Sequence, residues 1–313
     1  QNNAVLEELK KNPYIVNSLD EKDRIRKAPA PFTTSSMQQD AANKINFSTR
    51  KTMMVAQQLY EGIEIKGHGT IGLVSYIRTD SVRISDEAKA QAREYILEKM
   101  GEEYYSNNIY KNRKGDVQDA HEAIRPSHIE LEPDEIKDSL SRDQYKLYKL
   151  IWNRFLASQI APARFKAVNA GISNGDYLFK ATGSKLIFDG FLKVYQQGKD
   201  GEENNLLPHL EKGEQLELVK VEGTQNFTQP PARFTEASLV KDLEDKDIGR
   251  PSTYAPIVAT LMDRKYVTKD KKSLMPTELG FIVIDMMQQY FKEIVDTGFT
   301  AQMEENLDDI EAK

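Results

Sequence analysis

The chain has 313 residues, a formal net charge of −6 at pH 7 and no cysteine. Its length predicts roughly two or three domains, and the missing cysteines exclude a disulfide framework and thiolate metal sites. No segment approaches the ~18 consecutive apolar residues that a membrane span needs, so we expect a cytoplasmic protein that makes no contact with a membrane.

The first part of the chain predicts two consecutive helices. A possible strand at 14–16 precedes the segment APAPFTTSS, whose prolines interrupt regular structure. A helix should begin near Ser35. A second helix, KTMMVAQQLYEG, should follow a cap at Ser48 and Thr49 and end near Gly62.

The middle of the chain predicts a strand and two long helices. A strand should end at Tyr76, and Ser85 should cap a helix that Gly101 closes. A capping-box sequence starting at Ser141 should open another helix, which stops before Pro162. Its large apolar residues are expected in the core: Tyr148, Ile151, Trp152 and Phe155.

Residues 164–227 change to short alternating segments, which predict an antiparallel sheet with a hairpin at Asn174 and Gly175. Helices should return after Pro230. The chain stops within AQMEENLDDIEAK, an amphipathic helical pattern, and begins without methionine. We therefore expect a fragment of a longer protein.

One internal similarity stands out. PAPFTTSSM at 29–37 resembles PARFTEASL at 231–239, and each copy leads to a Ser-Thr pair that opens another helix. A basic hairpin sequence follows the second copy. Both copies are interpreted as winged-helix units, which often bind DNA but also serve as plain packing modules. The sequence leaves both roles open.

The segment GLVSYIRTDSVRIS at 72–85 is the leading candidate for chemistry. A tyrosine at a strand end is usually a packing residue. Here Arg78 lies two residues after Tyr76, and on a strand the two side chains would share a face. A phenol beside a guanidinium suits a nucleophile that attacks a phosphate.

Three motifs together resemble bacterial type IA DNA topoisomerases. They are GLVSYIRTDSVRIS, DAHEAIRPS at 119–127, and PPARFTEASLVKDLEDKDIGRPSTYAPIVATLMDRKYV at 230–267, in the family's order. Two further stretches, at 30–62 and 299–310, extend the likeness to nearly the whole chain. The insert IEIKGHGTIGL resembles the Gram-positive-like members.

The resemblance implies covalent catalysis. Tyr76 matches the tyrosine that attacks a phosphodiester of single-stranded DNA and forms a 5′-phosphotyrosine while another strand passes through the gap. Arg78 could grip the scissile phosphate, and a lysine there would lose the planar fork. Thr79 and Asp80 are candidate contacts near the phosphate; Asp80 could instead orient Arg78 or cap the next turn.

The other two motifs supply further candidates. His121 matches a histidine placed near the DNA phosphate, where a charged imidazole would be useful. Arg125 could contact a phosphate or pair with Glu122. In the third motif, Arg250, Ser252 and Thr253 stand at a helix start and are candidate DNA-backbone contacts; Ser252 could also simply cap that helix.

The resemblance also implies a cofactor. Mg²⁺ in this family is bound by a Toprim domain, which we do not find in this sequence, so no metal site is expected in the chain. The acidic C-terminal residues have the spacing of a solvated helix face. We expect the chain alone to be unable to relax supercoiled DNA.

The fold implied is an α+β, multidomain, toroidal gate. Residues 1–32 and 162–229 should form a discontinuous β-rich arch. Residues 33–161 should form a helical, winged-helix-like domain with the catalytic tyrosine, and 230–313 a second, truncated winged-helix-like unit of the base. Prolines place possible hinges near 28–34 and 160–165.

The expected substrates are single-stranded and negatively supercoiled DNA, relaxed without ATP by a monomer in the bacterial nucleoid. Two other functions remain open. One is a module that binds single-stranded DNA without cutting it, and the other is a partner-binding protein that reuses the fold.

Overall fold

The computed structural model describes residues 2–112, 121–196 and 205–311. It is a mixed α and β structure that divides into two compact units. Unit 1 consists of Gln1–Ala28, Glu103–Asn107 and Ile160–Pro230; unit 2 consists of Pro29–Glu102, Asn108–Gln159 and Pro231–Lys313. Among the described residues, no helix has the length and apolar character needed to cross a membrane.

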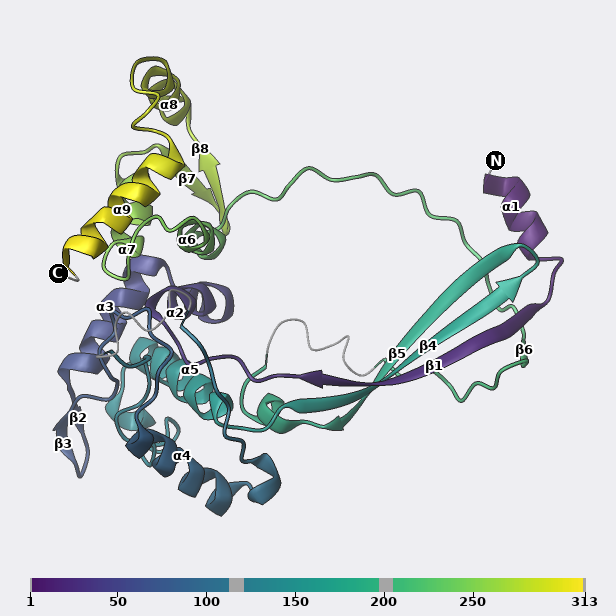
Figure 1. Cartoon of the computed structure of the whole chain (residues 1–313), viewed down its shortest axis with the longest axis horizontal. Coiled ribbons are helices and arrows are strands. Elements are labelled where there is room, and N and C mark those ends of the chain that lie inside the picture. Colours follow the sequence, from purple (N-terminus) through teal and green to yellow (C-terminus); the bar gives the residue numbers. More distant parts are fainter. Residues whose placement is uncertain (1, 113–120, 197–204, 312–313) are drawn as a thin grey trace. The chain divides into compact units, whose positions relative to one another are not determined.

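Unit 1 is built on an antiparallel sheet in the order β5-β4-β1-β6. Its three long strands run side by side (Figure 1). The strands are β1 (Tyr14–Arg26), β4 (Ala163–Asn174), β5 (Tyr177–Phe188) and β6 (Gln215–Leu216), with helix α1 (Asn2–Leu9) ahead of them. The hairpin at Asn174 and Gly175 is confirmed, and Gly175 has the positive φ of 57° that this tight turn requires.

Two strand predictions were inaccurate in length. The strand expected at 14–16 continues to Arg26, because β1 pairs with β4 from Ile15 to Arg26, with one irregularity between Val16 and Ser18. The segment QLELVKVEG at 215–223 forms only the two-residue β6, because β1 offers it pairing at Tyr14 and Ile15 alone. Alternation of apolar residues indicates a strand but does not say how much of a neighbouring edge is available.

Unit 2 contains the sequence repeat as two copies of a helix-helix-hairpin arrangement. The first copy comprises α2 (Thr34–Asp40), a π-helical turn (Ala41–Ile45), α3 (Thr49–Glu61), β2 (Ile63–Ile65) and β3 (Gly69–Ile71). The second comprises α6 (Glu236–Asp245), α7 (Tyr254–Asp263), β7 (Val267–Asp270) and β8 (Ser273–Pro276). The hairpin after Gly62 was not predicted, since its glycines suggested only a break.

The same local chemistry starts both copies. Thr33 caps α2 in a capping box with Ser36, and Thr235 caps α6 in the same way with Ser238. In each box the two side chains satisfy backbone N–H groups that the first helical turn leaves unpaired. The similarity between PAPFTTSSM and PARFTEASL is therefore a repeated helix start.

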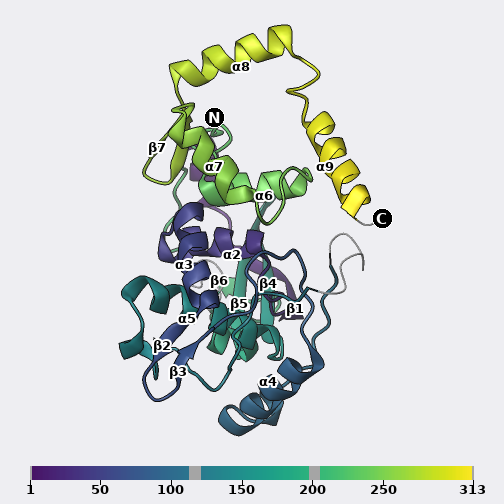
Figure 2. The same ribbon diagram turned by 90° about the vertical axis from the view of Figure 1, so that its left-hand side faces the viewer.

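The two copies pack against each other, α2 against α6 and α3 against α7 (Figure 2). A buried carboxylate joins them: Glu236 of α6 accepts hydrogen bonds from the backbone N–H of Thr49 at 2.7 Å and from its hydroxyl at 3.1 Å. Lys269 of β7 completes an ion pair with Glu236 at 2.8 Å. Ser35 also donates a hydrogen bond to Glu244, at 2.8 Å.

The two long helices that lie between the repeats in the sequence have the predicted boundaries. Helix α4 (Asp86–Lys99) is capped by Ser85, and α5 (Arg142–Ser158) begins with the predicted capping box of Ser141. Tyr148, Ile151, Trp152 and Phe155 are buried, which confirms them as core residues. Short 3-10 helices lie at Glu102–Tyr104, Lys137–Ser139 and Gly190–Lys193.

Helices α8 (Glu278–Tyr290) and α9 (Thr297–Glu311) end the described chain. No residue of α8 is buried, and the apolar stripe of α9 formed by Met303, Leu307 and Ile310 is exposed. The amphipathic pattern thus predicted the helix, but the stripe does not pack into the core of unit 2.

Candidate active site and nucleic-acid interface

The first two motifs are held together by backbone pairing. Val74 forms an antiparallel bridge with Pro126, and the N–H of Ser75 donates to the carbonyl of Arg125 at 2.9 Å. The Ser75 hydroxyl donates to the carbonyl of Ala123 at 2.8 Å and accepts the N–H of Arg125 at 3.0 Å. Segments about fifty residues apart in sequence therefore build one surface.

Burial alternates through the segment that follows. Tyr76, Arg78 and Asp80 are exposed. Ile77, Thr79 and Ser81 between them are buried. The predicted strand ending at Tyr76 is wrong, because the segment is irregular, but burial still alternates along it and leaves both Tyr76 and Arg78 on the exposed side.

Thr34, the first residue of α2, enforces this alternation. Its hydroxyl donates to the carbonyl of Ile77 at 2.7 Å and accepts the N–H of Thr79 at 2.9 Å, while its own N–H donates to the Thr79 carbonyl at 2.9 Å. These bonds replace a strand partner, and they hold the backbone on both sides of Arg78.

Tyr76 lies between two other aromatic rings. Its side chain is 42% exposed, the ring of Tyr60 meets it edge-on at 5.5 Å, and the His121 ring stacks at 6.4 Å with an interplanar angle of 30°. His121 thus reaches the candidate nucleophile, as its motif predicted. Tyr60, at the end of α3, was missed, because sequence alone does not show which ring approaches Tyr76.

Arg125 is engaged inside the protein. Its guanidinium forms a two-pronged ion pair with Glu122, at 2.9 and 2.7 Å, and its side chain is 18% exposed. Glu122 also accepts the N–H of Ser85 at 2.7 Å. Burial alone would raise the pKa of Glu122, but hydrogen bonds from Ser85 and the charge of Arg125 hold it below its usual value. The pairing alternative for Arg125 is the one observed.

Thr79 and Asp80 differ in accessibility. Thr79 is 2% exposed, and its hydroxyl accepts the N–H of Ser81 at 3.0 Å, so this group supports the loop. Asp80 is exposed, and within the described residues it neither pairs with Arg78 nor caps the following turn.

In the third motif, the Gly249–Tyr254 turn is fastened by the acidic helix α9. Asp308 forms a two-pronged ion pair with Arg250, at 3.0 and 2.7 Å, and Glu304 accepts the N–H of Gly249 at 3.0 Å. The hydrogen bonds that Arg250 donates to Asp308 raise the pKa of Arg250. The third nitrogen of the guanidinium donates to the carbonyls of Gly249 and Asp247. Arg250 therefore has little donor capacity left for a phosphate.

The spacing of Glu304 and Asp308 places them on one face of α9, so the interpretation of that cluster as a solvated face was incomplete. Replacing Asp308 with alanine should loosen the Gly249–Tyr254 turn. We expect amide hydrogen exchange there to accelerate about fivefold, since a partly exposed two-pronged pair is worth about 1 kcal/mol. Asp309→Ala, on an exposed position of the same helix, is the control; equal exchange rates in the two variants would contradict this role.

Ser252 and Thr253 have separate environments. Thr253 is the residue before α7, and its hydroxyl accepts the N–H of Arg250 at 2.7 Å, which closes the turn. Ser252 is exposed and does not cap α7, so the structure contradicts the capping alternative for this residue.

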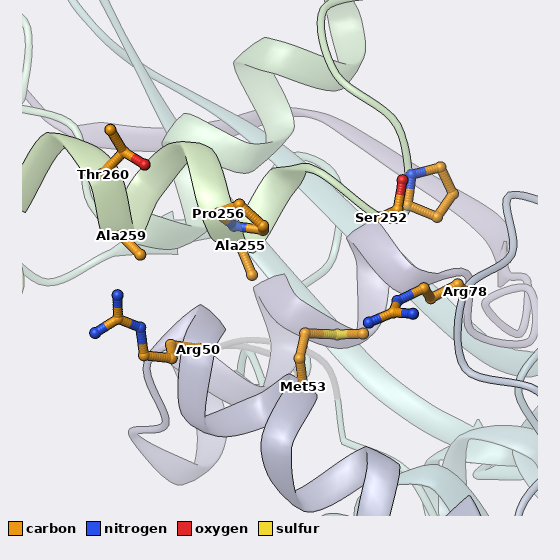
Figure 3. A pocket seen from close by; sticks show the side chains of 9 residues that line it. Arg50, Met53, Arg78, Ser252, Ala255, Pro256, Ala259 and Thr260 are labelled. Atoms are coloured by element: carbon orange, nitrogen blue, oxygen red, sulfur yellow. The ribbon is translucent and has the colours of Figure 1, made fainter.

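Arg78 and Ser252 line the same pocket, whose volume is about 350 Å³. Figure 3 shows Arg50 and Met53 on one wall, with Ala255, Ala259 and Thr260 of α7 facing them. The Arg50 guanidinium pairs with Asp263 at 2.5 Å. The first and third motifs therefore meet at a pocket lined by a guanidinium and a hydroxyl, groups suited to phosphate oxygens.

Acidic and histidine side chains are the groups of this chain that could hold a metal ion. Across the described part of the chain, no group of three or more His, Asp or Glu side chains is arranged to hold a metal. The described residues therefore do not fit an Mg²⁺ site of the kind that the family resemblance implies.

Comparisons with known proteins agree with these motifs. A sequence profile of the family described as DNA topoisomerase matches residues 1–313. The chain is also similar to full-length topoisomerase I from Thermotoga maritima, with 40% identity and a TM-score of 0.89. That match covers 99% of this chain and 51% of the other, so the chain spans about half of its length. By its family match and its structural likeness, the chain belongs to the bacterial type IA DNA topoisomerases.

Proposed function

We propose that this chain carries the nucleophile and part of the DNA-binding surface of an enzyme that relaxes negatively supercoiled DNA without ATP. The observation that carries the proposal is the shared exposed face of Tyr76 and Arg78, with His121 beside the tyrosine ring. The reaction class is inferred from family membership, and the exposure of Tyr76 and Arg78 supports these residues as the ones that act in it.

In the proposed reaction, the Tyr76 oxygen attacks the phosphorus of a single-stranded phosphodiester. A bond forms from the tyrosine oxygen to phosphorus, and the bond from phosphorus to the 3′ oxygen breaks. The phenol loses its proton to water or to a base from another part of the enzyme, and the leaving 3′ oxygen gains one. Religation reverses these steps after another strand has passed.

Arg78 would stabilise the charge that builds on the phosphate oxygens during attack. His121 would hold the neighbouring phosphate, and Ser252 would contact the strand on the other side of the pocket. Thr79, Arg125, Arg250 and Thr253 would act by positioning the loops, given their contacts inside the protein. Asp80, exposed on the same face, stays a candidate contact.

Mg²⁺ is assigned in this proposal to the Toprim domain expected from the resemblance. The toroidal arrangement, the β-rich arch formed by unit 1 and the winged-helix character of the two repeats also belong to the proposal. The boundaries of unit 1 after Ala28 and before Ile160 lie close to the proposed hinges.

Joining the chain to a Toprim segment and incubating it with Mg²⁺ and single-stranded DNA tests this function. We expect covalent DNA on the peptide that contains Tyr76, and no relaxation of supercoiled DNA by the chain alone. DNA binding without any adduct would leave the non-cleaving module as the function, and relaxation by the chain alone would overturn the assignment of Mg²⁺ chemistry to another domain.

The variant Arg78→Lys tests whether cleavage needs the planar guanidinium group of Arg78 or only its charge. The charge remains, but the planar fork that can bind two phosphate oxygens is lost, so we expect the cleavage rate to fall about tenfold with little change in stability. Single-turnover cleavage of a labelled oligonucleotide measures the effect. Lys89→Arg on α4, an exposed exchange of the same two residue types, is the control. An unchanged rate in Arg78→Lys would show that only the charge matters.

A further inference from the structure

A second hollow in unit 2 is rich in positive charge and is not used by the proposed cleavage reaction. Its volume is about 520 Å³. The 3-10 helix at Lys137–Ser139, the residue that follows it and the N-terminal part of α5 supply its lining residues: Lys137, Asp138, Leu140, Arg142, Tyr145 and Lys146. Three of these side chains are cationic and one is acidic.

Two cations of this hollow are unpaired, and two of the acids near it are paired elsewhere; Asp138 is the one acid that lines the hollow itself. In the described part of the chain, neither Arg142 nor Lys146 forms an ion pair. Asp134 is held by Lys149, at 2.9 Å to each carboxylate oxygen, and Asp143 is paired with Lys51 at 2.8 Å. The local excess of positive charge is therefore not cancelled by these carboxylates, and it suits a polyanion.

An aromatic ring stands among these cations. Tyr145 donates its hydroxyl to Asp134, which fixes the ring, and two ammonium groups lie over the ring, that of Lys137 at 5.2 Å and that of Lys149 at 5.4 Å from the centroid. Cations that follow a phosphate backbone, combined with a fixed ring on which a base can stack, are the features by which proteins hold single-stranded nucleic acid.

The unexplained hairpin of β2 and β3 adjoins the same hollow. The backbone N–H of Lys66, at the turn, donates to the hydroxyl of Ser139 at 3.1 Å. The exposed Lys66 side chain therefore extends the cationic surface beyond the lining residues. The glycine-containing insert, which the cleavage chemistry does not need, has a place in this surface.

Helix α3 separates the hollow from the candidate nucleophile. Tyr60 of α3 contacts Tyr76, whereas Gln58 accepts a hydrogen bond at 3.1 Å from Gln144 in the first turn of α5. Two residues along a helix point in directions about 200° apart. The hollow thus lies on another side of α3 from Tyr76.

We propose that the hollow formed by Lys137, Arg142, Tyr145 and Lys146 binds single-stranded DNA, with its cations on backbone phosphates and a base on the Tyr145 ring. The inference rests on the proposed function, since it supposes that DNA is the ligand of this enzyme. It adds a binding site separate from the cleavage site, able to hold a strand before or after Tyr76 acts.

The test is binding of fluorescein-labelled oligo(dT) by the whole chain, followed by anisotropy over a range of salt concentrations. Replacing Lys137, Arg142 and Lys146 together with glutamine should weaken binding at least about tenfold, and should reduce the slope of log Kd against log salt by about 2. The matched control replaces Lys99, Lys111 and Lys292, which are exposed elsewhere in unit 2. Equal weakening by both triple variants, or none by the first, would overturn the proposal.

The ring has its own test. Tyr145→Leu should weaken oligo(dT) binding about fivefold or more but leave binding of an abasic oligonucleotide nearly unchanged, whereas Tyr145→Phe should resemble the unmodified chain. If Tyr145→Leu, with normal helix content, binds both oligo(dT) and the abasic oligonucleotide more weakly, stacking on this ring is excluded.

Cleavage distinguishes this inference from the proposed function. Joined to a Toprim segment, the first triple variant should still form the Tyr76 adduct at saturating DNA. If the triple variant forms the adduct and also binds oligo(dT) as tightly as the unmodified chain, the hollow is not a DNA-binding site, but the proposed cleavage function stands. If the triple variant binds oligo(dT) more weakly but even the unmodified chain forms no adduct, the hollow is a DNA-binding site and the proposed cleavage function is wrong.

Discussion

Replacing Tyr76 with phenylalanine should abolish covalent attachment of DNA while leaving the fold and DNA binding intact. The phenylalanine ring can keep the contacts with Tyr60 and His121, at 5.5 and 6.4 Å, so only the oxygen that would attack phosphorus is lost. Removing a covalent nucleophile costs far more than removing a supporting group, and we expect cleavage to fall by more than about 10³-fold.

The measurement is the fraction of labelled single-stranded DNA that becomes covalently bound when the chain is joined to a Toprim segment. Tyr290→Phe is the matched control, because Tyr290 is an exposed tyrosine in the same unit with no place in the site. Adduct formation by Tyr76→Phe at the normal rate would mean that another residue is the nucleophile, and the proposed mechanism would be wrong.

The second large effect concerns stability. Glu236→Ala should lower the free energy of unfolding of unit 2 by about 2–3 kcal/mol. Glu236 is 3% exposed, and it serves Thr49 and Lys269 at once. Its removal leaves two donors of Thr49 without their acceptor and separates the two repeats. Lys269 is 39% exposed and can be hydrated, which is why the value stays below the ~3–5 kcal/mol of a fully buried pair.

Urea unfolding followed by far-ultraviolet circular dichroism measures this change. Asp242→Ala on the same helix removes a different acid-lysine pair, the exposed contact with Lys246 at 2.6 Å. That pair should contribute no more than about 0.5 kcal/mol. Similar losses in the two variants would show that the buried position of Glu236 gives it no special weight.

Local structure was largely predictable because its causes lie within a few residues. The capping box of Ser141 and the cap of Ser85 each satisfy N–H groups of the next turn, so the sequence places those helix starts without knowledge of the fold. The joint exposure of Tyr76 and Arg78 depends in addition on Thr34, whose hydrogen bonds to Ile77 and Thr79 hold an irregular segment in place of the predicted strand.

Roles that depend on distant partners were not predictable. For Arg125 the sequence left open a phosphate or the neighbouring Glu122, and the structure shows the pair with Glu122, which in turn accepts the N–H of the distant Ser85. Arg250 was assigned to DNA because its motif stands at a helix start. Its actual partner, Asp308, is 58 residues away and on a helix whose acids seemed merely solvated.

The difference between what the sequence and what the tertiary structure determined has a physical basis. The sequence by itself determined where helices start and end, because hydrogen bonds of the helix caps and steric periodicity act over short spans, and its three motifs identified the family by resemblance. Only the tertiary structure decided which polar groups are already satisfied inside the protein. A buried Thr79, an engaged Arg250 and a cationic hollow beside Tyr145 each follow from the packing of elements distant in the chain.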